Sequence, residues 1–233
     1  MTMDPTESST DICRSLQAIL DAYDPLQIRY APNELLFQAG CFAAGVHLVT
    51  QGIVQESYAH PAAAGPEVAI GLYGPPSLLG HEVFAPDSHP LHSISCRAVT
   101  WVSVLFVEQT VFDAAIAADS TLRAFQTRHL LERQSALTRA LWRSQLDPAG
   151  RIRATLQEII PYCETMEDGR LLLFAEIDPH RLAELSYVSY RKARELLRSQ
   201  WQMDRINRRW VLSPGHLRSP FPGEPTSATA SPR

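Results

Sequence analysis

The chain has 233 residues, of which 45% are hydrophobic, so it is long and apolar enough for about two domains with packed cores. No apolar run approaches the ~20 residues of a membrane span, and the polar, acidic N-terminus carries no apolar signal segment, so we expect a cytoplasmic protein without a membrane partner. Widely spaced cysteines without any C-x-x-C pair argue against a disulfide framework or a zinc knuckle: Cys13, Cys41, Cys96 and Cys163.

Charge is unevenly distributed along the chain, although the net charge is only −4. Residues 1–120 carry 3 arginines against 13 acidic residues, whereas residues 121–233 carry 18 basic against 12 acidic residues. Every basic residue except Lys192 is an arginine, and a guanidinium group pairs bidentately with phosphate or guanine, or with carboxylates at protein interfaces. Between residues 180 and 218 the count is 9 basic to 3 acidic, which favours nucleic-acid binding over a merely solvated surface.

The N-terminal half has the texture of a small β domain. After a polar tail at residues 1–10, which we expect to be disordered, an amphipathic helix is predicted from Ile12 to Leu20. Short apolar or alternating runs then follow from Ile28 to Phe106, separated by Gly and Pro at intervals near the ~8–12 residues of an antiparallel sandwich or barrel. Residues 60–66, HPAAAGP, are read as a hairpin tip.

From Gln109 the apolar period becomes helical, with a break expected near Asp119, and it continues to about Gln145. Although His129 and Arg133 interrupt a clean heptad, an apolar face is formed by Leu122, Phe125, Leu130, Leu137 and Leu141. A helix of ~25 residues is about 37 Å long, which suits a dimer seam better than a domain cap.

The C-terminal part begins with LDPAG at 146–150, read as a hinge before a helix that starts at Arg151. A strand is predicted over residues 171–177. Asp178 followed by Pro179 then marks a helix start, because an acidic cap accepts orphan amide hydrogens and Pro gives up a donor without a partner. Residues 186–188 break that helix, and Ser189 is expected to cap a second one. Residues 203–212 are read as a hairpin wing, and residues 214–233 as a disordered tail.

In this order the pieces resemble a transcription regulator of the Crp/Fnr superfamily, from about Ile28 to Leu212. The motifs that carry the resemblance are GVHLVTQGIVQES, PEVAIGLYGPPSLLGHEVF, LDPAGRIRATL and IDPHRLAELSYVSYRKARELL. The resemblance implies an α+β fold with a cyclic-nucleotide-binding-type β-roll, a long dimerisation helix and a winged helix-turn-helix. The expected divisions are a tail and short helix at 1–20, the roll at 21–108, the dimerisation helix at 109–146, the DNA-binding domain at 147–213 and the tail at 214–233.

The resemblance further implies a homodimer on a palindromic DNA operator, with RNA polymerase as an expected partner. The residues assigned to DNA are Ser189, Tyr190, Arg191, Lys192, Arg194, Glu195 and Arg198 on the second helix, and Arg205, Arg208 and Arg209 on the wing.

Family members commonly place Glu early in this helix and Arg four residues later, whereas this chain has Arg191 and Glu195. Because Arg prefers guanine and Glu accepts from cytosine, we predict an operator half-site that differs from the family consensus. The alternative is a solvated helix laced by an Arg191–Glu195 pair. Tyr187 replaces the usual turn Gly, and a positive φ there would cost Tyr roughly 1 kcal/mol or more.

The resemblance places an effector pocket at Gly80, His81, Glu82, His92 and Ser93. The Arg that binds the cyclic phosphate in cyclic-AMP-binding members is missing, and a neutral imidazole replaces it poorly, so standard cyclic-nucleotide contacts are not expected. His81, His89 and His92 with Cys96 raise a heme or metal hypothesis, but they are interpreted instead as partly exposed loop histidines without a metal-ligand spacing. Cys13 stands alone, which excludes the iron–sulfur branch of the family.

Two other classes of function compete with this interpretation. A cyclic-nucleotide-type regulatory module that acts through protein partners is the main alternative, with the C-terminal helices as a protein dock. An enzyme is disfavoured, because the sequence offers no nucleophile–base pairing, phosphate-cradling loop or ligand triad, and hence no candidate catalytic residues.

Overall fold

The computed structural model describes residues 9–58, 68–84, 90–206 and 209–213. Several predicted features lie outside these ranges: residues 1–8 of the first expected tail, the hairpin tip at 60–66, His89, Arg208 and the tail at 214–233. Contacts divide the chain into two compact units, Met1–Leu137 and Thr138–Arg233. No helix in the described ranges combines the length and apolarity that crossing a membrane would need.

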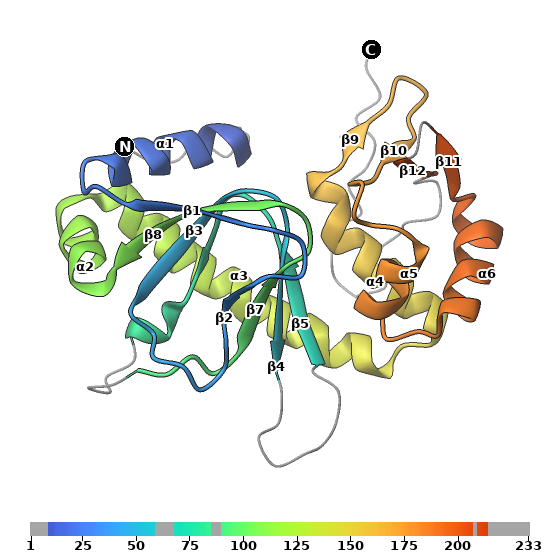
Figure 1. Ribbon diagram of the computed structural model, residues 1–233, viewed down its shortest axis with the longest axis horizontal. Helices are drawn as coiled ribbons and strands as arrows, with labels where there is room; N and C mark the ends of the chain where they lie inside the picture. The colour runs from blue at the N-terminus through green and yellow to red at the C-terminus, as the bar shows by residue number, and fades with distance from the viewer. Residues whose placement is uncertain (1–8, 59–67, 85–89, 207–208, 214–233) are drawn as a thin grey trace. The chain divides into compact units, whose positions relative to one another are not determined.

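The first unit is a β-roll of two four-stranded antiparallel sheets (Figure 1). One sheet has the order β1-β8-β3-β6, made of Leu26–Tyr30, Val102–Glu108, Gly45–Gln51 and Ser77–Leu79. The other has the order β2-β7-β4-β5, made of Leu35–Phe37, Ser95–Ala98, Val54–Tyr58 and Val68–Tyr73. Gly52 turns β3 into β4 with φ +82°, and an added Cβ would lie 2.0 Å from the Trp101 carbonyl oxygen. The two antiparallel sheets confirm the predicted all-β domain.

Two apolar clusters hold the first unit together. Residues such as Val49, Val54 and Val104 are fully buried in the cluster that draws on both sheets. Helices α1 (Ser9–Asp21) and α2 (Gln109–Ala118) contribute Leu16 and Phe112 to the other cluster. The helix expected from Ile12 is thus confirmed, and its apolar side is used in packing against the roll.

Helix α3 (Ser120–Gln145) has 26 residues, about 39 Å of helix. The predicted break before it is real, because the Asp119 carboxylate accepts hydrogen bonds from the Thr121 and Leu122 amides at 2.7 and 2.9 Å. Large apolar side chains remain exposed along its middle and end in this single chain: Leu130, Leu131, Leu137, Leu141 and Trp142.

The second unit combines helices α4 (Pro148–Ile159), α5 (Pro179–Leu185) and α6 (Tyr190–Trp201), which contact one another, with a small sheet. Ile152, Leu156, Leu182, Leu197 and Trp201 are almost fully buried in it. The sheet has the order β11-β12-β10-β9, from Asp204–Ile206, Arg209–Leu212, Leu171–Leu172 and Glu164–Thr165. A short 3-10 helix, Ile160–Tyr162, connects α4 to β9.

Two predicted element boundaries in this unit were wrong. The strand expected over 171–177 ends at Leu172. The Leu173 amide still donates to the Trp210 carbonyl at 2.9 Å, but the chain then turns, with the Ile177 amide donating to the Phe174 carbonyl at 3.0 Å, and Leu173 and Ile177 are fully buried. Helix α4 begins at Pro148 rather than Arg151, since the Asp147 carboxylate accepts the Gly150 amide at 2.8 Å and acts as the N-cap.

Candidate nucleic-acid interface

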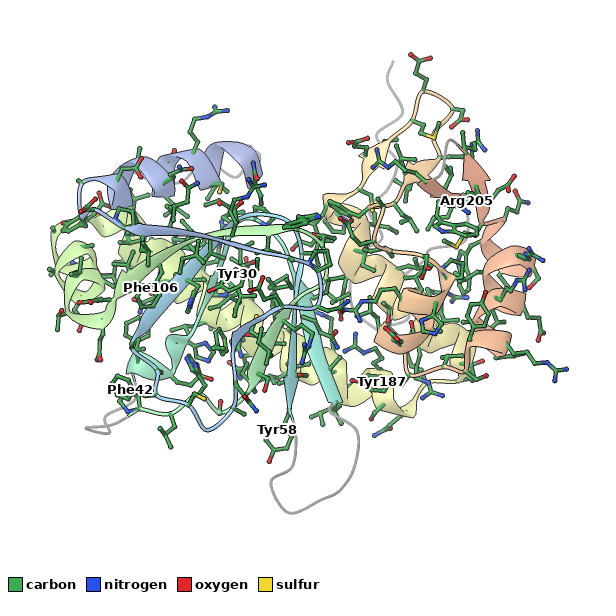
Figure 2. The ribbon with its side chains drawn as sticks, in the orientation of Figure 1. Tyr30, Phe42, Tyr58, Phe106, Tyr187 and Arg205 are labelled. Atoms are coloured by element: carbon green, nitrogen blue, oxygen red, sulfur yellow. The ribbon has the colours of Figure 1, made fainter. Side chains whose placement is uncertain are left out.

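The turn between α5 and α6 is built by local chemistry. The Asp178 carboxylate accepts the Arg181 amide at 2.7 Å, and Pro179 occupies the first turn of α5, as predicted. Tyr187, which is labelled in Figure 2, lies in this turn. It adopts φ 52°, the left-handed conformation anticipated for the position that usually holds Gly. The Val188 amide donates to the Ala183 carbonyl at 3.0 Å and closes the turn. Ser189 occupies the N-cap position of α6, but its side chain makes no capping hydrogen bond, so the expected hydroxyl cap was wrong.

Helix α6 has two chemically distinct faces. Ala193, Leu196, Leu197 and Trp201 are buried, which fixes the helix against its neighbours. All the residues of α6 and its cap that the sequence assigned to DNA are exposed: Ser189, Tyr190, Arg191, Lys192, Arg194, Glu195 and Arg198. The structure therefore gathers them on one accessible surface, hereafter the α6 face.

Charge on the α6 face is incompletely neutralised. Lys192 Nζ lies 2.8 Å from Glu195 Oε1, so these two charges compensate each other. The Arg191–Glu195 pair considered from the sequence is not formed. Among the described residues, Arg191, Arg194 and Arg198 have no ion-pair partner, and the α6 face retains three uncompensated guanidinium groups.

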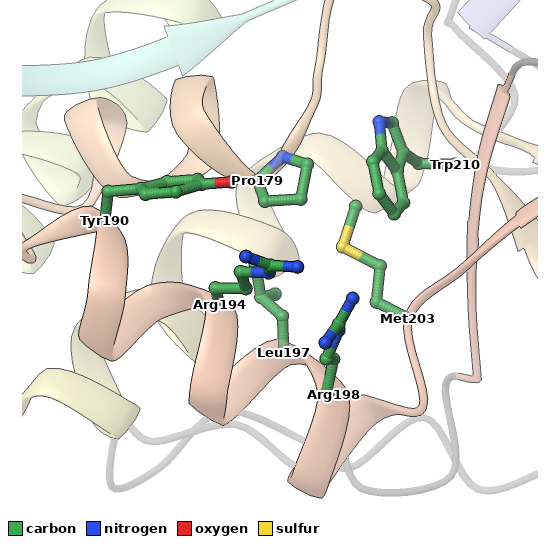
Figure 3. A pocket seen from close by; sticks show the side chains of 7 residues that line it. All are labelled: Pro179, Tyr190, Arg194, Leu197, Arg198, Met203 and Trp210. Atoms are coloured by element: carbon green, nitrogen blue, oxygen red, sulfur yellow. The ribbon is translucent and has the colours of Figure 1, made fainter.

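A hollow of about 140 Å³ lies between α6 and the wing (Figure 3). Apolar and aromatic side chains form its walls together with the stems of two arginines: Pro179, Tyr190, Arg194, Leu197, Arg198, Met203 and Trp210. In the close view, the Met203 thioether lies beside the Trp210 indole, the Arg194 guanidinium is drawn in front of Leu197, and the Arg198 guanidinium lies to its right. The hollow thus combines an apolar floor with a doubly cationic rim.

The predicted wing is confirmed as the antiparallel β11–β12 pair, but its arginines differ in role. Arg205 is exposed, and its guanidinium carbon lies 5.8 Å from the Trp210 ring centroid (Figure 2). Arg209 is half-buried: its Nε donates to the Leu173 carbonyl at 3.2 Å, and its Nη1 lies 3.4 Å from Glu164 Oε2. Arg209 therefore holds the wing to the rest of the sheet. Arg208 lies outside the described residues.

In the roll, the structure brings the predicted effector residues together and pairs them with one another. Glu82 Oε1 accepts the Ser93 amide at 3.2 Å and the Ser93 hydroxyl at 2.8 Å, while Glu82 Oε2 lies 3.4 Å from His92 Nδ1. Although burial opposes ionisation, the His92 hydrogen bond and the nearby His81 lower the pKa of Glu82 to about 2. Gly80 packs behind them with φ +80°, where an added Cβ would lie 3.5 Å from the His92 ring.

The interpretation of all the roll histidines as partly exposed was wrong for His92. Its ring is buried and stacks on Phe37 with a centroid distance of 4.0 Å. The described residues contain no group of three His, Cys, Asp or Glu side chains arranged to hold a metal ion. All four cysteines are free thiols.

The sequence reasoning missed a charged pair inside the first unit. Arg133 of α3 bonds Glu56 of β4, and both side chains are buried. The Arg133 guanidinium carbon also lies 6.0 Å from the Tyr73 ring centroid, and His129, one turn earlier, is buried beside the same ring. The signal was visible as the two residues that interrupt the heptad, but the sequence did not show what Arg133 contacts.

Comparison with models of protein families finds no match, and no curated protein matches either. Solved structures do. The c-di-GMP-responsive global regulator CLP of Xanthomonas campestris is 19% identical over 86% of this chain and 99% of its own, with a TM-score of 0.64. FixK2 from Bradyrhizobium japonicum is 16% identical over 81% and 92%, with a TM-score of 0.62. A CRP/FNR-family transcriptional regulator from Thermus thermophilus is 15% identical over 80% and 93%, with a TM-score of 0.58.

In chain order, the elements described above form a β-roll, a long helix and a winged helix-turn-helix. The chain has the fold of the Crp/Fnr regulators, which confirms the fold that its motifs suggested.

Proposed function

We propose that the protein is a dimeric, sequence-specific DNA-binding transcription regulator of the Crp/Fnr type. The observation that carries this proposal is the α6 face, where three guanidinium groups stand uncompensated within the described structure. An α-helix fits the major groove of B-DNA, and a guanidinium group there bridges the two acceptors of guanine. Because the other face of α6 is buried, the arginines project from a fixed support.

Contacts to DNA divide by position along α6. Tyr190, Arg191 and Glu195 would read base edges, while Ser189, Lys192, Arg194 and Arg198 would divide between bases and phosphates. The hollow in Figure 3 suits part of one DNA strand, with phosphate on its cationic rim and sugar on its apolar floor. Arg205 would contact the backbone from the wing. Since Arg and Glu are exchanged relative to the usual family order, the half-site should differ from the family consensus.

The partner for α3 would be a second copy of the chain. Leu130, Leu137 and Leu141 recur at the seven- and four-residue spacings that place them on one stripe, and they are 41%, 45% and 70% exposed. A second α3 would remove this stripe from water. Two α6 faces could then occupy major grooves about 34–36 Å apart on a palindromic operator.

The β-roll would serve as an effector or protein-contact domain that does not use the standard cyclic-AMP contacts. Its Glu82 is already bonded to Ser93 and His92, and no Arg takes the place of the missing phosphate ligand in that cluster. RNA polymerase is the expected protein partner, the cytoplasm the expected location, and no enzymatic activity is proposed.

A second candidate is a regulatory module that acts through protein partners. The observation that favours it is an apolar pair on the roll. Phe42 and Leu91 form an isolated antiparallel β-bridge, yet their side chains are 58% and 54% exposed. In this case the C-terminal helices would also dock a protein.

Salt titration of duplex DNA binding separates the two candidates. A steep fall in affinity with rising salt supports the regulator, because released counterions dominate such binding. Folded, dimeric protein that binds no duplex even at low salt supports the protein-contact module. Selection from an oligonucleotide library then tests the half-site, and recovery of the ordinary family palindrome would refute the predicted exchange.

A further inference from the structure

We propose that the protein's own Glu56–Arg133 ion pair makes the regulatory connection between the β-roll and α3, so that no bound molecule is needed to complete it. The inference rests on the proposed function, because the output of that connection is DNA binding. It assigns a coupling role to two residues that lie outside both the α6 face and the predicted effector cluster.

The pair is a contact between two elements far apart in sequence. Glu56 lies in the middle of β4 and is 0% exposed; Arg133 is 5% exposed and points from α3 into the roll. Arg133 interacts electrostatically with His81, and Glu56 with Glu82, so the pair lies within electrostatic reach of the predicted effector residues. The cation missing from the effector loop is thus supplied nearby by α3, and the protein itself provides its counter-ion.

A buried ion pair of this kind is poorly explained by stability alone. Taking two charges out of water is costly, and well-packed apolar residues commonly stabilise a core as well or better. What an ion pair adds is positional specificity, because Arg133 can satisfy its charge only where it meets Glu56. We therefore infer that the pair fixes where α3 sits on the roll.

The far end of α3 has a corresponding connection. Arg143 Nη1 lies 3.0 Å from both carboxylate oxygens of Glu158 on α4, and the two side chains are 5% and 16% exposed. Arg133 and Arg143 are ten residues apart, about 15 Å along one helix. One buried arginine thus joins α3 to the roll, and a second joins it to the first helix of the DNA-binding unit.

A double-mutant cycle on the full chain separates coupling from stability. In Glu56→Gln, the buried Arg133 guanidinium keeps its charge, because it cannot lose its proton. In Arg133→Met, the buried Glu56 carboxylate can take up a proton and become neutral. We expect each single substitution to weaken DNA binding at least tenfold, and Glu56→Gln more than Arg133→Met. The double variant Glu56→Gln/Arg133→Met should recover thermal stability, since no buried charge remains, but not DNA affinity.

Arg128→Met is the matched control, because Arg128 pairs with Glu132 at 3.3 Å on the exposed surface of the same helix, and its removal should change neither readout. Double-variant protein with wild-type DNA affinity, or single variants that are folded and bind normally, would overturn the proposal.

A third readout keeps the two proposals separable. Amide hydrogen exchange at residues 130–145 should accelerate in the double variant relative to wild type and to Arg128→Met. If wild-type protein binds no duplex DNA, the proposed function fails, and unchanged exchange in the double variant would independently overturn the connection.

Discussion

Removing one uncompensated guanidinium from the α6 face should change how DNA binding depends on salt. The substitution is Arg194→Gln, which keeps a long polar side chain at an exposed helix position and removes one positive charge. Arg194 has no ion-pair partner among the described residues, so its charge is available to a phosphate group. A dimer carries two copies, and the variant therefore loses two such contacts.

The expected size follows from counterion release. Each phosphate contact contributes a slope of about −0.9 to the plot of log K against log salt, so the slope should become shallower by about 1.8. If each charge-assisted contact contributes about 1.5 kcal/mol, the loss of two is about 3 kcal/mol, roughly a hundredfold in Kd.

Fluorescence anisotropy with a selected duplex at five or more salt concentrations measures both quantities. Arg170→Gln is the control: it makes the same charge change in the same unit, but Arg170 Nε is bonded to Asp168 Oδ2 at 2.7 Å. Its slope should match that of the wild type. Equal changes in slope for both variants would mean that binding senses only net charge, and the assignment of the α6 face would be wrong.

Three further predictions concern other parts of the chain. Tyr187→Gly should raise the free energy of unfolding of the second unit by about 0.5 kcal/mol in thermal melts, because relief of the left-handed strain exceeds the added chain entropy. Burial lowers the pKa of His129 to about 4, so the unfolded chain binds its proton first. In urea denaturation, the free energy of unfolding of the wild type minus that of His129→Gln should therefore decline by up to about 3 kcal/mol as pH falls from about 6.5 to about 4. Iodoacetamide should alkylate exposed Cys41 in native protein, whereas Cys96, whose pKa burial raises well above its usual range, should react only after unfolding, as read by mass spectrometry.

Each of these has a contradicting result. A lower melting temperature for Tyr187→Gly would show that the tyrosine side chain contributes more than its backbone costs. A stability difference at His129 that does not vary with pH would mean that folding leaves the pKa of the imidazole unchanged. Alkylation of Cys96 at the rate of Cys41 would show that the sheet around it opens readily.

Features set by neighbouring residues were predictable from the sequence. The Asp178–Pro179 helix start, the break at Asp119 and the positive φ at Tyr187 all depend on groups within a few positions of each other. The amphipathic spacing of α6 also defined its exposed arginines correctly, because the helix has one buried face. Most of the candidate DNA surface therefore followed from local chemistry and helical period.

Features set by tertiary packing were not predictable. Glu56 and Arg133 are 77 positions apart, and only the fold brings them together. Arg209 was expected to contact DNA, and because β12 lies beside β10 its guanidinium also reaches the Leu173 carbonyl, a partner that the sequence did not show. His92 lies in a polar loop sequence, yet it stacks on Phe37 of β2. In each case, the side chain's partner comes from a distant segment.

The reliance of the α6 face on arginine makes its positive charge permanent. Guanidinium groups stay protonated at any physiological pH, and enzymes that acetylate lysine cannot neutralise them. Lys192 is the one acetylatable side chain there, and it holds the Glu195 carboxylate. Acetylation would therefore both remove a cation and release an anion, so a single modification would change the charge balance of this surface twice.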